Sequence, residues 1–394
     1  MGRKREKIKE HQLAGFKYFK AISTMLESLH DAGCERDIAG NRILHMDQYA
    51  SLILLYMFNP ICKSLRSLQQ VSELKKVQKQ FGAQRASLGS LSEAARVFDS
   101  ELLKKIIQEL STKLTNVSRI PGFNSSKGVL TAVDGSLVEA AGKMAWALWR
   151  NDRNAIKVHC QYEILRGVPV GIEVTDANTS EKAVLSRNLQ PNRIYVLDRG
   201  YAKYSLLQEI INIKSSFVCR IRDNAVYKTI ENKELTGKAV KEGIVFDKTV
   251  ELGGETAEIK LKNIRIVAVK CNPKSQSCRP GDRGGPRQGQ ILLIATDLFD
   301  IEPETIAAIY EHRWTIEIYF RFFKHILGCR HLISHNQNGI EIQMYMAIIA
   351  CMLISLWTGR KPTLRTYEMI CWYFMGMADL EELQAHIARQ KLQK

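Results

Sequence analysis

The segment Tyr-Glu-His-Arg-Trp-Thr-Ile-Glu-Ile-Tyr-Phe-Arg-Phe-Phe-Lys, residues 310–324, decides the fold expected for this chain. It contains no glycine or proline and its apolar residues recur at helical spacing, so we predict a helix. At about 100° per residue, one stripe of this helix, roughly 60° wide, is polar and consists of Tyr310, Arg313, Glu317 and Lys324. The neighbouring stripe is apolar and is expected to enter a core: Ile309, Ile316, Phe320, Phe323 and Leu327.

The polar stripe suits a metal ion with a phosphate beside it. A carboxylate such as Glu317 binds a hard cation through oxygen, the guanidinium of Arg313 can form two hydrogen bonds to a phosphate, and Lys324 adds a point charge. The same residue types at Arg-x-x-x-Glu spacing also form solvated ion pairs on ordinary amphipathic helices. Residue types alone favour this second interpretation, so the metal site needs support from elsewhere in the chain.

The composition is that of an ordinary globular protein with an excess of positive charge. Of 394 residues, 45% are hydrophobic and 25% charged, and 57 Lys and Arg against 41 Asp and Glu give a formal net charge of +16 at pH 7. A chain of this length can bury a sizeable core in two or three structural regions. The positive charge favours a polyanionic partner such as nucleic acid, because counterions are released on binding. A merely basic or ribosome-associated protein is the alternative.

The nine cysteines argue against a zinc site and for a reducing compartment. None form a C-x-x-C pair, and no histidine cluster accompanies Cys271 and Cys278. Their scattered positions and odd number, without a signal peptide, are typical of the cytoplasm. The longest apolar run, Met344 to Trp357, is about 14 residues long, which is too short for a bilayer and predicts a buried helix.

The first 120 residues have a helical pattern. Residues 1–12 are basic and are expected to be a solvated tail or an arm on phosphate. Ser90-Leu-Ser-Glu93 has the spacing of a capping box that opens the last helix of this region. Two helices across the turn at 82–89 could be a helix-turn-helix or part of a plain bundle, and the residues leave both open. The helices are expected at 14–32, 46–58, 62–81 and 92–115.

After a linker at 120–128, the pattern changes to short apolar runs, and two of these end in an aspartate. Residues 129–133 precede Asp134, and residues 194–197 precede Asp198. An aspartate at the carboxyl edge of a buried strand lies where α/β sheets place their sites, although either aspartate could simply cap a turn. The other elements expected here are strands at 156–165, 168–175 and 217–221, a helix from Ser180 and a helix ending near Ile213.

Between residues 224 and 290 the pattern is first strand-like and then basic. Residues 270–290 carry five Lys or Arg among Gly and Pro, which is typical either of a mobile basic loop near DNA or of a solvated loop. A strand at 290–296 precedes the segment 310–324, and three helices are expected after it, at 337–358, 364–376 and 379–393. The alternating runs that predict strands are 243–246, 248–252, 257–261 and 263–269.

The spacing Tyr310-(2)-Arg313-(3)-Glu317-(6)-Lys324, with Arg-Trp-x-Ile-Glu inside it, resembles the Tyr-Arg-Glu-Lys signature of bacterial insertion-sequence transposases. These transposases form the "IS four" type of the Asp-Asp-Glu superfamily. Asp198-Arg-Gly-Tyr is similar to the second-aspartate motif of the same family. The resemblance covers about residues 90–340 and is most specific at 310–324.

This resemblance implies an α/β fold with a ribonuclease-H-like catalytic core that a β-rich insertion interrupts. A helical N-terminal region would bind the DNA ends, and a helical C-terminal region would follow the core. The implied boundaries are 1–120 for the N-terminal region, 128–223 and 291–335 for the core, 224–290 for the insertion and 336–394 for the C-terminal region.

One feature departs from the family pattern. Relatives that cut through a DNA hairpin hold a flipped base with an aromatic residue of the insertion, often Trp, and none of the five Trp of this chain lies there. Tyr227 or Phe246 could take this part by stacking, but core packing is the stronger expectation for both. The hairpin route is therefore not predicted.

The resemblance also implies a metal-dependent transposase that cleaves DNA at the ends of an insertion sequence and transfers the strands. Asp134, Asp198 and Glu317 would be the catalytic residues and would hold two Mg²⁺ ions, for which Mn²⁺ can substitute. The residues implied to bind DNA are Tyr310, Arg313, Lys324 and, by a weaker match, Arg220.

The implied partners are the transposon ends, the target DNA and a second copy of the chain in a synaptic homodimer. The implied location is the bacterial cytoplasm, at the nucleoid and away from membranes. Two alternatives stay open at this point: a non-catalytic DNA-binding protein derived from a transposase, and a structure-specific DNA nuclease. The first should have lost at least one of the three carboxylates, and all three are present.

Overall fold

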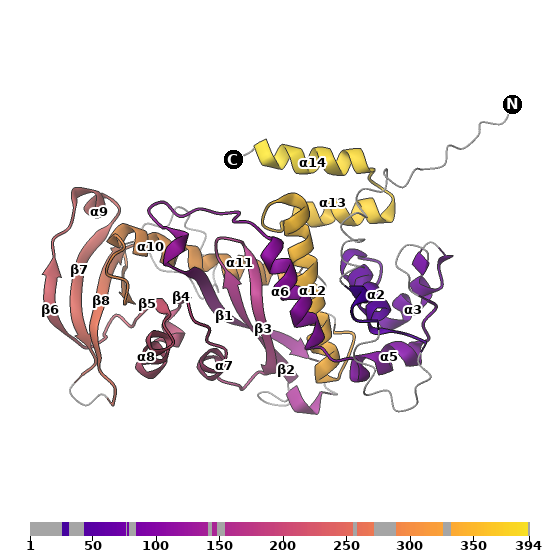
Figure 1. Ribbon diagram of the computed structural model, residues 1–394, viewed down its shortest axis with the longest axis horizontal. Helices are drawn as coiled ribbons and strands as arrows, with labels where there is room; N and C mark the ends of the chain where they lie inside the picture. Colours follow the sequence, from indigo (N-terminus) through magenta and orange to yellow (C-terminus); the bar gives the residue numbers. More distant parts are fainter. Residues whose placement is uncertain are drawn as a thin grey trace.

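The chain forms a mixed α/β structure with one large sheet, helices on both faces of the sheet and a helical layer at one end (Figure 1). The computed structural model describes residues 26–30, 43–75, 77–78, 84–140, 144–147, 154–254, 258–271, 289–325 and 332–392. Of the helix expected at 14–32, only residues 26–30 are described. The basic segment 1–12 and residues 272–288 of the basic loop lie outside the described residues.

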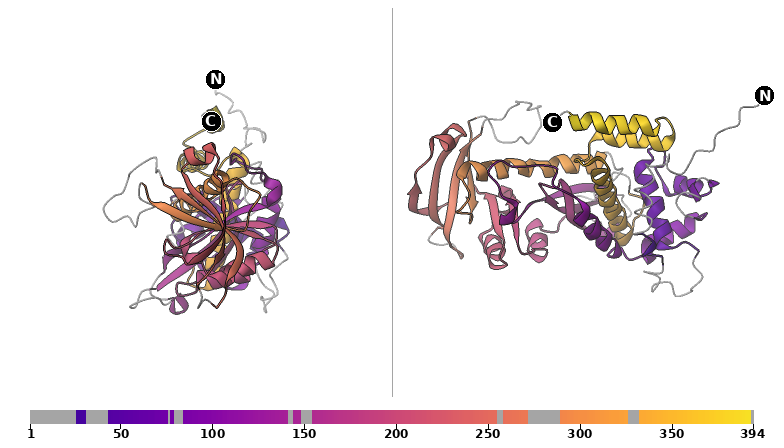
Figure 2. Two further views of the ribbon diagram at one scale, coloured as in Figure 1. Left: turned by 90° about the vertical axis from the view of Figure 1, so that its left-hand side faces the viewer. Right: turned by 45° about the horizontal axis from the view of Figure 1, so that its top comes forward.

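The sheet has nine strands, with a parallel centre and antiparallel flanks. Its order is β3-β2-β1-β4-β5-β9-β8-β7-β6. The centre, β1-β4-β5, is parallel, and the other neighbouring pairs are antiparallel. Seen along the molecule, the strands fan out with the usual twist (Figure 2). The strands are β1 Val129–Ala140, β2 Asn154–Glu163, β3 Val168–Asp176, β4 Arg193–Leu197, β5 Ser216–Arg220, β6 Tyr227–Lys233, β7 Ile244–Leu252, β8 Leu261–Lys270 and β9 Ile291–Thr296.

The strands between residues 224 and 290 continue this sheet. β8 pairs with β9 from Arg265 opposite Thr296 to Lys270 opposite Ile291, and β7 and β6 follow outward. The β-rich segment is therefore joined to the parallel centre by backbone hydrogen bonds through β9, and not only by its two chain connections.

Several expectations in this segment need correction. The runs at 243–246 and 248–252 form one strand, β7, because the charged Asp247 between them is buried against Arg265 and does not end the pairing. The strand expected at 257–261 is absent over residues 258–260, and Leu261 begins β8. The sequence pattern missed β6, which has no fully buried residue, and the short helix α9, Gly237–Lys241.

Side-chain alternation gives the two faces of the sheet different partners. Val133 and Leu197 point into a core with α7 and α8. The preceding residues, Ala132 and Val196, point into the larger core with α10, α11 and α12. These helices are α7 Glu181–Arg187, α8 Tyr204–Asn212, α10 Pro303–Glu311, α11 Thr315–His325 and α12 Gln337–Thr358.

The single helix predicted at 310–324 is broken. α10 ends at Glu311, a 3-10 helix spans His312–Trp314, and α11 starts at Thr315. Side chains that bind backbone carbonyls accompany the break: His312 Nδ1 lies 2.8 Å from the Ala308 oxygen, and Thr315 Oγ1 donates to the His312 oxygen at 2.8 Å.

The break changes how the two predicted stripes are arranged. Tyr310 lies on α10 and Glu317 on α11, so the polar residues do not follow one straight helix. The apolar stripe is still buried, because α10 and α11 present it to the same core, although Leu327 lies outside the described residues. The buried residues are Ile309, Ile316, Phe320 and Phe323.

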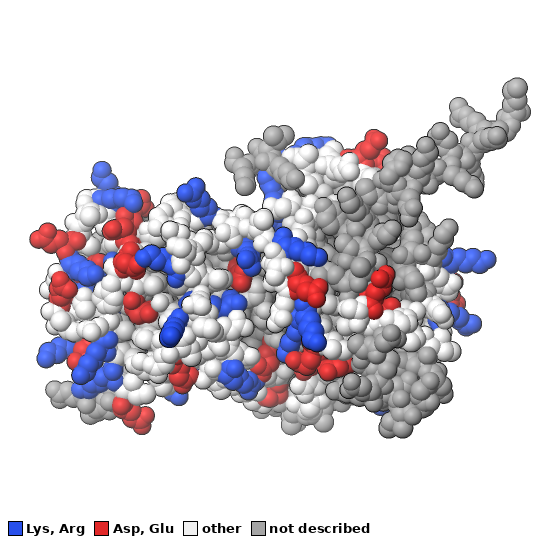
Figure 3. All heavy atoms as spheres, viewed as in Figure 1, with Lys and Arg blue, Asp and Glu red and all other residues white. Residues whose placement is uncertain are grey.

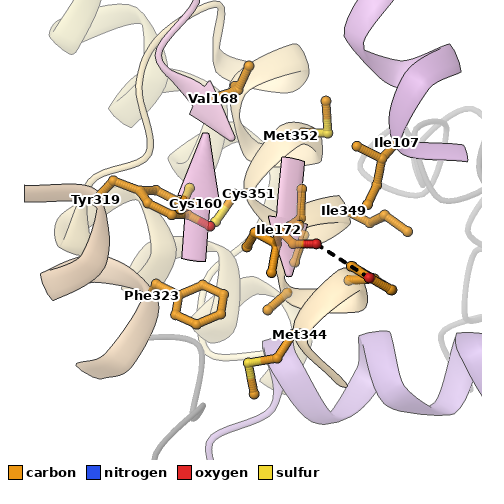
Figure 4. Packing of buried hydrophobic residues seen from close by; sticks show 14 of the residues in the cluster. Ile107, Cys160, Val168, Ile172, Tyr319, Phe323, Met344, Ile349, Cys351 and Met352 are labelled. Carbon is orange, nitrogen blue, oxygen red and sulfur yellow. Dashed lines mark hydrogen bonds between the residues drawn. The ribbon is translucent and has the colours of Figure 1, made fainter. Parts of the chain in front are cut away.

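Helix α12 is the buried helix expected at 337–358. It packs against β3, α6, α2 and α5, and Figure 4 shows Met344 and Met352 with Ile172 of β3 and Ile107 of α6. Among the described helices, α12 alone has the length and apolar character to cross a membrane. However, 89% of its apolar window is buried inside the fold. Its surroundings are therefore those of a core helix.

The N-terminal helices show a break of their own. The helix expected at 92–115 is two helices, α5 and α6, because α12 supplies partners for the turn between them: Asn338 Nδ2 donates to the Phe98 oxygen at 2.6 Å. The capping box expected at Ser90 is wrong, since Ser87 caps α5 by accepting from the Ser90 amide at 3.0 Å. These helices are α2 Met46–Phe58, α3 Leu65–Ser72, α5 Leu88–Val97 and α6 Leu102–Lys113.

The C-terminal helices lie over the helical layer (Figure 1). They are close to the expected ranges and are tied to the N-terminal helices, since the Tyr367 hydroxyl donates to the Met57 oxygen of α2 at 2.6 Å. On the face in Figure 3, Lys and Arg side chains are interspersed with Asp and Glu. The remaining elements are α13 Leu364–Met375, α14 Leu380–Leu392 and the 3-10 helices Ser125–Lys127, Ala145–Ala147 and Arg199–Tyr201.

Candidate active site

Strand register brings Asp134, Asp198 and Arg220 into one row. β1 and β4 run parallel with Ala132 opposite Val196, so two residues further along Asp134 lies beside Asp198. β4 and β5 pair with Leu197 opposite Cys219, so the next residues bring Asp198 beside Arg220. All three side chains belong to the face that α10 and α11 cover, because they lie an even number of residues from Ala132, Val196 and Val218.

Asp134 lies inside a strand and not at its end. β1 continues to Ala140 because it stays paired with β2, where Asp134 is opposite Cys160. The expectation that the strand ends at Asp134 is therefore wrong. The carboxylate Oδ1 of Asp134 accepts a hydrogen bond from the Gly135 amide at 2.8 Å. The side chain is thus held on a rigid element.

Asp198 follows the end of β4, as predicted. It opens the 3-10 turn at Arg199–Tyr201, and its Oδ1 accepts from the Gly200 amide at 2.7 Å. A Cβ at position 200 would lie 3.0 Å from that same oxygen, so glycine allows the close approach. The second aspartate is fixed by a turn, whereas the first is fixed by a strand.

Glu317 lies on the first turn of α11 and is bound to Arg313. Arg313 Nη2 donates to Glu317 Oε1 at 2.6 Å. The Arg313 side chain is 13% exposed and that of Glu317 is 30% exposed. The pair is therefore partly buried, unlike the solvated pair that the residue types alone would favour.

The electrostatics indicate that the three carboxylates lie in one site. Burial raises the pKa of Asp134 to about 7. The Gly135 amide and the Arg313 guanidinium oppose this rise in the pKa, and the negative charges of Asp198 and Glu317 add to it. Arg313 is the cation that compensates the cluster.

The three carboxylates are suitable ligands for a hard cation, but their oxygens do not converge on a single position. Among the described residues, no three His, Cys, Asp or Glu side chains lie close enough together to hold a metal ion. The Arg313–Glu317 hydrogen bond is one physical reason, because it holds the Glu317 carboxylate on the guanidinium. The carboxylates themselves are the ligands that Mg²⁺ and Mn²⁺ prefer.

The residues expected on DNA border the carboxylates. Burial raises the pKa of Tyr310, and the nearby charges of Arg313 and Arg220 lower it. Arg220 Nε is buried with no hydrogen-bond partner among the described residues. Lys324 Nζ donates to the Leu137 oxygen, three residues after Asp134 on β1. All four therefore lie at the same region of the molecule.

Two residues near the aspartates were not among the predicted site residues. Glu181 at the start of α7 lies so close to Gly135 that a Cβ there would be 2.8 Å from Glu181 Oε1. Tyr201, from the motif that starts at Asp198, is 2% exposed, and its hydroxyl lies near the negative charge of Glu181. The signal in the sequence was the glycine after Asp134, which leaves room for a side chain from another element.

Comparison with known proteins identifies the family of this chain. Residues 125–353 match the family model of the transposase DDE domain. The chain is 22% identical over 277 residues to a probable transposase for insertion sequence element IS5377 from Geobacillus stearothermophilus, covering 70% of this chain and 68% of that protein. It is 24% identical over 237 residues to the putative transposase y4zB from Sinorhizobium fredii, covering 58% of this chain and 61% of that protein.

A third relative is a putative transposase for insertion sequence element IS4SA from Synechocystis, 21% identical over 276 residues and covering 68% of this chain and 71% of that protein. Among solved structures, a piggyBac transposase in a synaptic complex with hairpin DNA matches 96% of this chain and 84% of its own, with a TM-score of 0.43 and 11% identity. Because the matched residues 125–353 make up more than half of the chain, this protein belongs to the family of DDE-domain transposases.

Proposed function

We propose that this transposase cleaves DNA at the ends of an insertion sequence and joins those ends to a target, with Asp134, Asp198 and Glu317 as its catalytic residues. The observation that carries the proposal is the row formed by Asp134 on β1 and Asp198 directly after the neighbouring parallel strand β4. α11, which carries Glu317, covers the face on which this row lies.

The three carboxylates would hold two divalent cations, Mg²⁺ or Mn²⁺. When bound, such ions activate an oxygen nucleophile and stabilise charge on the phosphoryl group. The buried position of Asp134 supports this assignment, because a carboxylate that burial makes reluctant to ionise gains from a nearby cation. We propose that Asp134 and Asp198, fixed by β1 and by the turn after β4, provide the rigid half of the metal site.

Arg313 would have two partners during the reaction. Without DNA and metal it binds Glu317. A divalent cation would compete for the same carboxylate, and the planar guanidinium would then be available to a phosphate of the DNA. Tyr310 lies beside Arg313 and Arg220, so we propose that these three side chains bind phosphates next to the scissile bond, with Lys324 further along β1.

The finer architecture follows from the same proposal. Three antiparallel strands followed by two parallel strands, β3-β2-β1-β4-β5, agree with a ribonuclease-H-like core at 128–223 and 291–335. The strands at 224–290 would be an insertion that extends the sheet. Residues 1–120 would bind transposon ends and residues 336–394 would form the C-terminal region.

We further propose a homodimer in the synaptic complex and a location in the bacterial cytoplasm at the nucleoid. The net charge of +16 supports a nucleic-acid partner. The described cysteines are free, which agrees with a reducing compartment.

The test uses the purified full chain and a plasmid that carries the DNA flanking its gene, incubated with Mg²⁺. Glu317→Gln and Asp134→Asn should bind DNA like the wild type and produce no cleavage. Glu311→Gln, which changes an exposed carboxylate at the end of α10, should cleave at the wild-type rate. Cleavage by Glu317→Gln would remove this residue from the metal site.

The same assay separates the two alternatives. Joining of pre-cut ends to a target plasmid identifies a transposase, whereas hydrolysis without joining identifies a structure-specific nuclease. DNA binding without either reaction at any Mg²⁺ or Mn²⁺ concentration identifies a non-catalytic DNA-binding protein.

A further inference from the structure

A fourth carboxylate lies next to the aspartates, on the opposite face of the sheet. Gly135 shares its face with Val133, which packs against α7 and α8. Glu181, the first residue of α7, approaches Gly135 so closely that an added Cβ would lie 2.8 Å from its Oε1 and 2.9 Å from its Cδ. The carboxylate therefore contacts the backbone of β1 one residue after Asp134.

Tyr201 joins this carboxylate to the second aspartate. Its backbone amide donates to the backbone carbonyl oxygen of Asp198 at 3.1 Å. This bond closes the turn that presents the Asp198 side chain. Its ring is 2% exposed and lies in the core between the sheet, α7 and α8. Its hydroxyl lies near the Glu181 carboxylate, whose negative charge raises the pKa of Tyr201.

The chemistry fixes which of these two groups would donate to the other. Burial raises the pKa of Tyr201 well above its ordinary value, and the negative charges of Glu181, Asp134 and Asp198 raise it further. The phenol therefore keeps its proton and would donate it to the Glu181 carboxylate. On the other side, Lys157 Nζ lies 3.5 Å from Glu181 Oε1 and supplies a compensating charge.

We propose that Glu181 is a positioning residue for the catalytic aspartates: by accepting the Tyr201 hydroxyl while it packs on Gly135, it fixes the turn that carries Asp198 relative to the strand that carries Asp134. This inference rests on the proposed function, because the distance between the two aspartates matters if they share metal ions. Groups that orient metal ligands commonly change metal affinity about 10–100-fold when they are removed.

The contacts favour positioning over direct metal binding. Asp134 and Asp198 lie on the face that α10 and α11 cover, whereas the Glu181 carboxylate lies on the α7 face, against a glycine that points away from α11. Its identified neighbours are Tyr201 and Lys157, a donor and a cation. Lys157 therefore already compensates the charge of the Glu181 carboxylate, which does not need a metal ion for this purpose.

The experiment measures Mn²⁺ binding to the full-length protein by electron paramagnetic resonance, together with the melting temperature of each variant. Glu181→Ala and Tyr201→Phe should each weaken Mn²⁺ binding about tenfold or more. The double variant should be no weaker than either single variant, because both changes remove the same proposed hydrogen bond. Glu181→Gln should bind Mn²⁺ nearly as the wild type does, because its amide oxygen can accept from Tyr201.

Tyr204→Phe is the matched control, since it removes a hydroxyl from the first residue of α8 without touching Glu181, and it should bind Mn²⁺ as the wild type does. Tyr201→Phe and Glu181→Gln change few atoms, so a wild-type melting temperature should accompany both results. If Tyr201→Phe binds Mn²⁺ normally, the positioning role is refuted. If Glu181→Gln loses Mn²⁺ as severely as Asp134→Asn, Glu181 is itself a ligand and the inference is wrong.

The failure of the proposed function would look different. If the wild type binds no Mn²⁺, or if Asp134→Asn binds it as well as the wild type, the metal site itself is refuted and this inference with it. If Mn²⁺ binding depends on Asp134 but not on the pair of Glu181 and Tyr201, only this inference fails.

Discussion

The buried ion pair between Arg265 on β8 and Asp247 on β7 carries a quantitative prediction. The two side chains are 3% and 4% exposed. Arg265 donates twice to Asp247, from Nε to Oδ1 at 2.9 Å and from Nη2 to Oδ2 at 2.7 Å. Its Nη1 donates to the oxygens of Leu298 at 2.9 Å and Ile301 at 2.5 Å. One guanidinium thus joins two strands to the loop that leads into α10.

The magnitude follows from what each substitution leaves behind. Arg265→Met leaves the Asp247 carboxylate buried without its partner, which costs about 3–5 kcal/mol, and removes the donor of two carbonyl groups. Replacing both partners, as in Asp247→Leu with Arg265→Met, leaves no buried charge. Only the two carbonyl groups then lose a partner, at a cost of about 1–3 kcal/mol. The carbonyl loss is common to both variants, so the double variant should be more stable than the single variant by about 3–5 kcal/mol.

Urea unfolding followed by circular dichroism measures these differences, with Lys262→Met as the control because Lys262 is exposed on the same strand. The control should stay within about 0.5 kcal/mol of the wild type. The reasoning is refuted if Arg265→Met costs less than about 1 kcal/mol, or if the double variant is no more stable than the single. Because Ile301 lies two residues before α10, Arg265→Met should also lower the cleavage rate by misplacing Tyr310.

Three further predictions concern acid stability, core packing and DNA affinity. Burial lowers the pKa of His159 from 6.5 to about 4, so its stabilising neutral form is fully present above pH 6.5 and is lost as the pH falls towards 4. The loss amounts to at most about 3 kcal/mol. His159→Gln should flatten the pH dependence of urea unfolding in that window, and an unchanged slope would contradict the assignment. Phe323 is fully buried beside Tyr319, so Phe323→Ala should lower the free energy of unfolding in urea by about 3–5 kcal/mol. Phe323→Leu should lower it by less than about 1.5 kcal/mol. Equal losses for the two variants would contradict a packing effect. Lys324→Ala should weaken DNA binding at all sequences. It should also lower the slope of log binding constant against log salt concentration by roughly one unit. An unchanged slope would show that Lys324 does not contact a phosphate.

The sequence predicted strands well where both faces are buried, because such a strand is a continuous apolar run. The apolar run after Arg193 predicted β4, and Asp198 follows its end as expected because a polar residue there meets the sheet edge. The same reasoning predicted that the first strand ends at Asp134, which is too early. β1 continues through Gly135 to Ala140, because its pairing with β2 does not require apolar side chains at each position.

The breaks in helices could not be read from the chain locally. α5 and α6 separate where Asn338 of α12 binds the turn between them. Asn338 lies 240 residues after Phe98, the residue whose carbonyl it binds. The 3-10 turn at His312 depends on side chains that bind backbone carbonyls, a contact that helical periodicity does not predict. In both places a tertiary or side-chain contact overrides a continuous helical pattern.

The same distinction explains which part of the site the sequence revealed. Asp134, Asp198 and Glu317 stand in recognisable motifs, and strand register then brings the two aspartates together without further information. Glu181 stands in no motif, and its approach to Gly135 depends on how α7 packs on the sheet. A motif therefore identifies the groups for which we propose a role in the reaction. The groups that we propose hold them at the right separation, Glu181 and Tyr201, are brought together by packing on the other face of the sheet.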